Sequence, residues 1–228
     1  MLGEAAVLAA FAVPGDAGAT LRVGPDNLLY VGVGAGAGEH GAQDLSSVAG
    51  KILRVDADGR PSRTNPWGSE VYTVGHRDPG GLVWDVAARR LWMSDRAESG
   101  DEINLIHPGA NYGWPAVTGG REHPFVTPPA LVLPRGAAVA GLATVTTPSH
   151  PLRGELFAAA AGLQDLLRLS VDPRGRLTMT ARLLQGRFGR VAQVASAPDG
   201  ALLFITRNGA GSDGGGDLLV RLTVPSRP

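Results

Sequence analysis

A strand–turn–strand unit recurs along the chain, and this repeat constrains the fold more than any other feature. Residues 21–31 read LRVGPDNLLYV and residues 194–204 read VASAPDGALLF, with the same Pro-Asp turn between two apolar runs. Looser copies occupy residues 82–93 and 140–158. The first strands of the four units start near residues 19, 80, 137 and 190, about 53 to 61 residues apart. Such a period is typical of β-propeller blades.

Each unit continues with further strands, so the repeat approaches the four strands of a blade. A third strand is predicted in every unit, at residues 51–56, 102–106, 165–171 and 217–224. A fourth strand is predicted in the first three units, at residues 70–74, 130–133 and 181–184. The 33 glycines and 17 prolines suit many short strands joined by turns, and no long stretch has the apolar period of a helix.

The last unit ends before a fourth strand, and an unpaired edge strand must be covered. Residues 4–13 read as an additional strand, which we expect to pair with the last blade and close the ring. The sequence therefore predicts an all-β fold, a single β-propeller domain over residues 1–228. It would have four blades of four antiparallel strands, closed by the N-terminal strand. A five-bladed ring and an open β-sandwich are the alternatives.

The balance of charge excludes several classes of partner. With 21 basic and 21 acidic residues the formal net charge is zero, so no basic surface for nucleic acid or membrane is expected. The absence of cysteine excludes disulfides and thiolate metal sites. No apolar run reaches the ~20 residues of a membrane span. Glu4 stands where a secretory signal would have basic residues, so we expect a cytoplasmic chain as written. Whether the chain forms a homodimer is not decided by the sequence.

In a propeller, the loops at one end of the central axis gather the functional groups, and here those loops carry many charges. We expect proton transfer from Asp16, Asp95 or His40, because such side chains serve as general acids or bases. We expect ligand contacts from five more side chains of these loops, which are Arg77, Asp78, Arg96, Arg135 and Arg190. The alternative is a ring of salt bridges that neutralises itself and plugs the channel.

Three stretches of the sequence resemble one known family. They are residues 42–59, 75–82 and 100–115, the last reading GDEINLIHPGANYGWP. They resemble the soluble quinoprotein glucose/sorbosone dehydrogenases, over about residues 20–224. The resemblance implies six-bladed, exported relatives that oxidise sugars with pyrroloquinoline quinone (PQQ) and calcium. This chain begins about where their third blade would.

The resemblance also implies a metal site, but one that lacks an acidic ligand. Asp101, Glu102 and the carbonyl of Tyr112 match a calcium site of the family. A later acidic ligand is not obvious in this sequence. The alternative is that the two carboxylates anchor a turn.

The positions that hold the quinone in the family are altered in this chain. Arg77 and Arg190 match family contact positions, but the asparagine after the first arginine becomes Asp78. Gly162 and Ala192 stand where the family has a lysine and a second arginine. PQQ carries three carboxylates and needs several cations around it. We therefore expect no cofactor, with PQQ and calcium as the alternative that the resemblance implies.

Asp16 stands where the family has its catalytic histidine, which makes it the first candidate for proton transfer. The sequence thus predicts a compact, repurposed member of this family. It would bind a small polar or sugar-like molecule in its axial funnel and act on it by acid/base chemistry without quinone. A PQQ-dependent oxidoreductase of sugars or alcohols is one alternative. A non-catalytic binding or interaction propeller is another.

Overall fold

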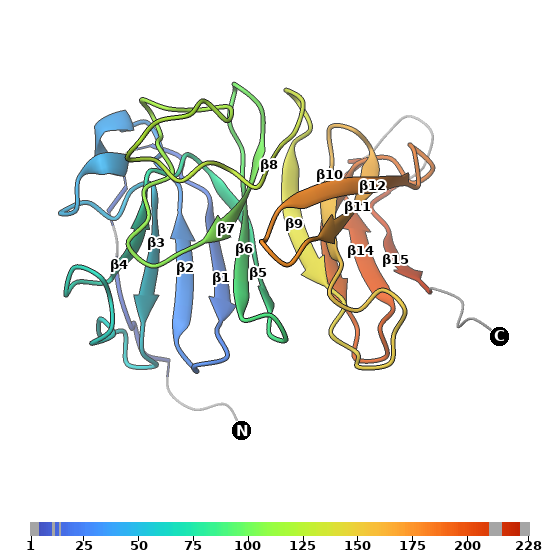
Figure 1. The fold of residues 1–228 in the computed structure, drawn as a ribbon, viewed down its shortest axis with the longest axis horizontal. Coiled ribbons are helices and arrows are strands. Elements are labelled where there is room, and N and C mark those ends of the chain that lie inside the picture. Colours follow the sequence, from blue (N-terminus) through green and yellow to red (C-terminus); the bar gives the residue numbers. More distant parts are fainter. Residues whose placement is uncertain (1–4, 11, 14, 210–215, 224–228) are drawn as a thin grey trace.

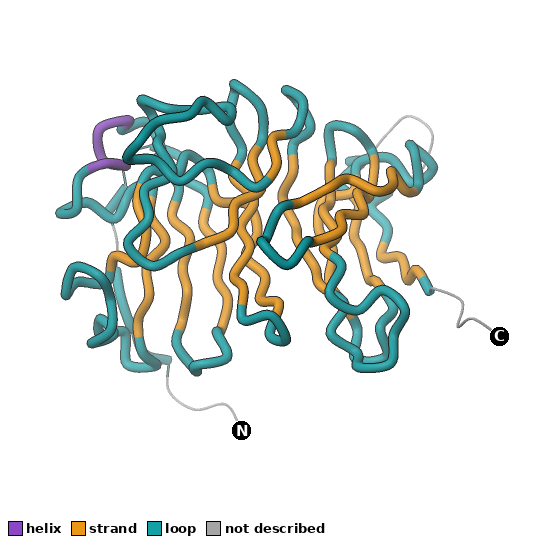
Figure 2. The backbone as a smooth tube through the Cα atoms, viewed as in Figure 1, coloured by secondary structure: helices purple, strands orange, loops and turns teal. Residues whose placement is uncertain are grey.

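The computed structural model describes residues 5–10, 12–13, 15–209 and 216–223, and within them it is nearly all β (Figures 1 and 2). The first sheet consists of β1 (Ala19–Val23), β2 (Leu29–Val33), β3 (Lys51–Val55) and β4 (Val71–Val74). The second consists of β5 (Pro79–Asp85), β6 (Arg90–Asp95), β7 (Glu102–Ile106) and β8 (Leu131–Val132). The third consists of β9 (Val139–Thr144), β10 (Leu156–Ala160), β11 (Asp165–Val171) and β12 (Leu177–Leu183). The fourth has β13 (Val191–Ser196), β14 (Leu202–Thr206) and β15 (Leu219–Leu222).

Each sheet is an antiparallel meander, so the prediction of four blade-like units is confirmed. A short helix, η1 (Glu39–Gln43), lies in the loop between β2 and β3. Among the residues that the structure covers, no helix is long and apolar enough to cross a membrane.

The turns explain why the repeat unit folds in the same way twice. Between β1 and β2, the side chain of Asp26 accepts the N–H of Leu28 at 3.3 Å. Between β13 and β14, the side chain of Asp199 accepts the N–H of Ala201 at 3.1 Å. Both aspartates follow a proline, which presets the turn, and each turn contains a residue with positive φ, Asn27 in the first and Gly200 in the second.

The sheets pack face to face because side chains alternate along their inner strands. On β5, Leu82 packs toward the first sheet and the next residue, Val83, packs toward the third. On β9, Leu142 packs toward the second sheet and the next residue, Ala143, packs toward the fourth. The inner strands therefore pack in the order β1, β5, β9, β13. Figure 1 shows the four sheets following one another in this order along the molecule.

The N-terminal segment does not close a ring, so this part of the sequence prediction is wrong. Among the described residues the fourth sheet has three strands, and residues 5–10, 12 and 13 form no strand. Val13 packs against the apolar cluster of the first sheet that includes Leu53 and Val71, and the carbonyl of Leu8 approaches Gly59 beside that sheet. The segment thus covers an apolar face close to it in sequence. Residues 4 and 11 of the predicted strand lie outside the described residues.

Replacing Val13 with serine tests this placement. We expect Val13→Ser to lower the free energy of unfolding by about 1–2 kcal/mol, because it removes apolar contact from the face of the first sheet. The matched control is Val7→Ser, whose valine is 86% exposed in the same segment. Urea unfolding measures the cost, and hydrogen exchange should show loss of protection in β3 and β4. Loss of protection in β14 and β15 instead would restore the predicted closure.

Candidate functional site

A polar pocket lies at the end of the first two sheets where β2 and β6 finish and β1 and β5 begin. We call it the mouth pocket. Its volume is about 530 Å³. It is lined by Gly15, Asp16, Ala17, Gly18, Gly34, Gly36, Arg77, Asp78 and Arg96. Four of the predicted site residues therefore come together in one pocket, from the segment before β1, the loop before β5 and the loop after β6.

The two arginines of the mouth pocket are each paired with a carboxylate. Arg96 Nη2 lies 2.7 Å from Asp78 Oδ2. Arg77 Nη2 lies 2.7 Å from Oε1 of Glu98, and the guanidinium of Arg77 lies over the ring of Trp114 at 5.5 Å. Both guanidiniums are thereby held in fixed orientations at the pocket wall. Both pairs remain partly accessible to solvent, so they contribute little to stability.

Asp95 lies beneath the pocket and orients the loop that carries two of its side chains. Its Oδ2 accepts the N–H of Arg77 at 3.1 Å, and its Oδ1 accepts the N–H of Asp78 at 2.6 Å. The buried His76 lies behind it, with Nδ1 3.5 Å from Asp95 Oδ2 and Nε2 2.8 Å from the hydroxyl of Thr73. Both oxygens of Asp95 are therefore engaged by the backbone of the loop.

A second cavity of about 480 Å³ adjoins the mouth pocket and follows the inner strands of all four sheets; we call it the axial cavity. The two share Gly18 and Arg96. Its far wall carries Arg190, Arg207 and Asp217 from the fourth sheet. Small side chains account for its width, namely Gly80, Ala138, Ala140, Ala161 and Ala192. Arg190 thus lies in the adjoining cavity and not in the mouth pocket.

Two further predicted residues line neither space. His40 is exposed in η1, and Arg135 is exposed in the turn before β9. The sequence analysis does not select Asp217 as a site residue, although it lies two residues before β15 and follows a glycine-rich stretch of the sequence. It had also treated the glycines of residues 32–38 only as a loop, whereas two of them, Gly34 and Gly36, form pocket wall.

The two carboxylates predicted to bind calcium accept backbone N–H groups. Asp101 Oδ2 accepts the N–H of Val139 at 2.8 Å, and Glu102 Oε1 accepts the N–H of Gly119 at 2.9 Å. The hydroxyl of Tyr112 donates to the carbonyl of Leu105 at 2.7 Å. Within the described ranges, no three His, Cys, Asp or Glu side chains are grouped to hold a metal ion. The predicted set of two carboxylates and the carbonyl of Tyr112 is not a group of that kind, so the calcium site stays a prediction.

Comparison with known proteins shows which family the chain matches. A family described as Glucose / Sorbosone dehydrogenase matches residues 8–221. The aldose sugar dehydrogenase YliI of Escherichia coli is 28% identical over 204 residues, covering 80% of this chain and 55% of its own length.

Two solved structures share the fold closely. One is an oxidoreductase assigned as a glucose dehydrogenase from Thermus thermophilus, at 37% identity and a TM-score of 0.82, covering 93% of this chain and 68% of its own. The other is the PQQ-bound aldose sugar dehydrogenase of Streptomyces coelicolor, at 31% identity and a TM-score of 0.81, covering 92% and 63%. The chain thus spans about half the length of the curated relative and about two-thirds of these structures.

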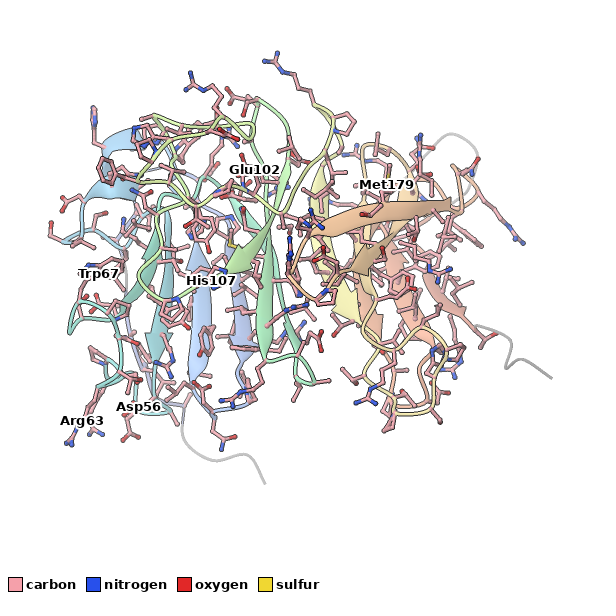
Figure 3. The ribbon with its side chains drawn as sticks, in the orientation of Figure 1. Asp56, Arg63, Trp67, Glu102, His107 and Met179 are labelled. Atoms are coloured by element: carbon pink, nitrogen blue, oxygen red, sulfur yellow. The ribbon has the colours of Figure 1, made fainter. Side chains whose placement is uncertain are left out.

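Glu102 provides a test of the electrostatics near the mouth, where it lies at the start of β7 (Figure 3). Burial, helped by the nearby Asp95 carboxylate, raises the pKa of Glu102 from 4.5 to about 7. A raised pKa means that the folded chain holds the proton of Glu102 more tightly than the unfolded chain does. The contribution of this group to the free energy of unfolding is therefore complete below about pH 4.5 and is lost as the pH rises to 7.

We therefore expect Glu102→Gln to unfold with a free energy about 1–3 kcal/mol higher than the wild type at pH 8, and to match it near pH 4. Glutamine keeps the acceptor for Gly119. Thermal and urea unfolding at both pH values measure the difference, with the exposed Glu122→Gln as control. An effect of equal size at both pH values would contradict this explanation.

Proposed function

The chain belongs to the glucose/sorbosone dehydrogenase family. From this premise we propose that it binds a small sugar-like molecule in the mouth pocket and that Asp16 accepts a proton from this molecule, without a quinone. The observation that carries the proposal is the gathering of Asp16, Arg77, Asp78 and Arg96 around one pocket of about 530 Å³. That volume lies within the usual range of small-molecule sites.

The chemistry of the wall suits a polyhydroxylated ligand. A sugar hydroxyl both donates and accepts hydrogen bonds, so it is matched by a carboxylate acceptor beside a guanidinium donor. Asp78 and Arg96 form such a neighbouring pair. Asp78 Oδ1 and Arg96 Nε are also buried without a hydrogen-bond partner among the described residues. A hydroxyl that enters between the two side chains would satisfy both atoms after a small rotation, and leaving them unpaired is costly.

Asp16 differs from the other carboxylate of the pocket in its surroundings. Asp78 is paired with Arg96, whereas Asp16 is exposed and forms no ion pair with any residue that the structure describes. A carboxylate that lines a pocket without such a pair is available to accept the proton of a sugar's anomeric hydroxyl and to return it to the ring oxygen as the ring C–O bond opens, which interconverts the two anomers without an oxidant. This supports Asp16 as the proton acceptor. Asp16 precedes β1, so its position does not depend on the loop that Asp95 orients.

The residues present do not fit PQQ. The family places a lysine at the position of Gly162, but a Cβ on Gly162 would lie 1.8 Å from the carbonyl oxygen of Gly136, so no larger side chain is accommodated there. The family's second late arginine is replaced by Ala192 on the wall of the axial cavity. Arg77 and Arg96 are already paired with carboxylates. Among the described arginines that line the two cavities, Arg190 and Arg207 remain outside an ion pair, which is too few for the three carboxylates of a quinone.

Titration calorimetry with a panel of aldoses and aldonates tests the binding site. We expect the Arg96→Ala, Asp78→Ala double variant, which removes both partners of an ion pair, to bind at least about tenfold more weakly than the wild type. Arg176→Ala is the control, because Arg176 pairs with Asp172 on the remote turn between β11 and β12. Unchanged affinity in the double variant, or no binding of any panel member to the wild type, would contradict the site.

Asp16→Asn separates binding from chemistry. We expect this variant to retain affinity within about threefold, since an amide oxygen still accepts a hydrogen bond, but to lose turnover. NMR spectra of the pure α anomer mixed with protein, followed over time, report how fast the two anomers interconvert. Turnover that survives in Asp16→Asn would exclude this residue as the proton acceptor. Binding without turnover in the wild type would instead favour a non-catalytic binding protein.

A quinone titration addresses the cofactor directly. On mixing with PQQ and calcium, we expect no change in the visible absorbance of the quinone at micromolar protein and no reduction of a dye with glucose. The reason is that, among the described arginines that line the two cavities, only Arg190 and Arg207 are outside an ion pair. Saturable binding at micromolar PQQ would show that the family's oxidative chemistry is retained.

A further inference from the structure

Two arginines of the fourth sheet lie beside each other on the wall of the axial cavity. In the register of β13 and β14, Val191 lies opposite Thr206, so Arg190 and Arg207 form the next facing pair. The N–H of Arg207 donates to the carbonyl of Arg190 at 2.9 Å. Side chains of such a pair leave the sheet on the same side, with Cβ atoms about 4.5–5.5 Å apart. Both arginines line the cavity.

These two like charges are not neutralised within the part of the chain that the structure describes. Neither guanidinium belongs to an ion pair there. The one described carboxylate that lines the axial cavity is Asp217, whose Oδ1 accepts the N–H groups of Asn208 at 2.6 Å and Gly209 at 3.3 Å. Like charges that face each other on a sheet repel. Two positive groups against one negative group leave an excess of one positive charge at this wall, which suits one anionic group.

The mouth pocket has the opposite excess. Its two arginines are each paired with a carboxylate, whereas Asp16 forms no ion pair with any described residue. The mouth pocket and the axial cavity adjoin, because both are lined by Gly18 and Arg96. The combined space therefore has an unpaired acceptor at one end and two unpaired guanidiniums at the other.

The wall between these ends is narrow in side-chain size and mostly uncharged. It is formed mainly by small residues, which are Gly80, Ala138, Ala140, Ala161 and Ala192. Such a surface accommodates the C–H groups of a sugar ring, but it offers no partner to a second anionic group. The arrangement thus matches a molecule with a hydroxyl at one end and a single carboxylate at the other.

We propose that the substrate is a hexuronate in its ring form, whose carboxylate lies between Arg190 and Arg207 while its anomeric hydroxyl faces Asp16. A hexuronate carries these groups on opposite sides of one ring, at C6 and C1. Guanidiniums bind a carboxylate through charge-assisted hydrogen bonds. This inference rests on the function proposed above and adds the charge of the substrate.

The chemistry stays balanced with this substrate. The anomeric hydroxyl gives its proton to Asp16, the ring C–O bond opens, and the ring oxygen takes the proton back. Closure on the other face of the aldehyde gives the second anomer. The carboxylate takes no part in these steps, so Arg190 and Arg207 act on binding and orientation.

D-Glucose and D-glucuronate test the inference as matched probes, because they differ only in the carboxylate at C6. Titration calorimetry with the wild type at low salt should show glucuronate binding at least about tenfold more tightly than glucose. The preference should shrink at high salt, since salt screens charges that are exposed to solvent.

Two variants assign this preference to the arginine pair. Arg190→Gln and Arg207→Gln should each lower the affinity for glucuronate at least about tenfold more than the affinity for glucose. Arg174→Gln is the matched control, because it removes the same charge from an exposed position on the turn between β11 and β12. Without ligand, Arg190→Gln should melt no earlier than the wild type, because it relieves the repulsion between like charges.

Three results would overturn the inference. One is equal affinity of the wild type for the two sugars. A second is an equal loss of affinity for both sugars in Arg190→Gln and Arg207→Gln, which would show a structural role. The third is a loss of preference in Arg174→Gln as large as in the other two variants. In each case glucose still binds, so the function proposed for the mouth pocket stands. Failure of both sugars to bind the wild type would instead contradict that function and this inference with it.

Discussion

Each inner sheet of this chain is apolar on both faces, and burying both faces requires a packed neighbour on each side. The alternation of side chains along β5 and β9 makes this a strict requirement, because consecutive residues point to opposite neighbours. Only a row of sheets or a closed ring satisfies it. The order of the four sheets, the buried core between them and the exposed aliphatic side chains at the two ends all follow from this one constraint.

The candidate site depends on the same packing. Sheets that stack face to face bring the beginnings of their inner strands together at one end, and the loops there form the mouth pocket and the axial cavity. The position of Arg77 and Asp78 is then refined locally by Asp95, whose two oxygens accept the N–H groups of both residues. A carboxylate that holds the loop backbone in this way leaves the side chains of the loop directed at the pocket. The pocket thus has a rigid base and charged walls, as ligand recognition requires.

The sequence predicted much of the fold because the signals were local. The predicted strands at residues 102–106 and 165–171 coincide with β7 and β11, since short apolar runs between turn residues specify strands without reference to distant parts of the chain. The N-terminal segment was misplaced because its partner is set by long-range packing. An apolar run such as residues 4–13 carries no information on whether Val13 meets the first sheet or the last.

The same limit applies to the site. The loops that carry Asp16, Arg77, Asp78 and Arg96 were predictable from the repeat, because every blade presents its connections at the same ends. The separate role of Asp95 was not, since its contacts with two backbone N–H groups depend on how one loop folds over another.

The claim on which the function rests is that a sugar-like ligand enters the mouth pocket. Amide NMR spectra recorded during a titration with D-glucose and D-gluconate test it most directly, because three glycines of the pocket wall, Gly18, Gly34 and Gly36, report on its occupancy. We expect saturable shifts of these amides with either ligand. Shifts confined to the pocket at the opposite end of the third and fourth sheets, around Thr147 and His150, or no saturable shifts at all, would contradict the account.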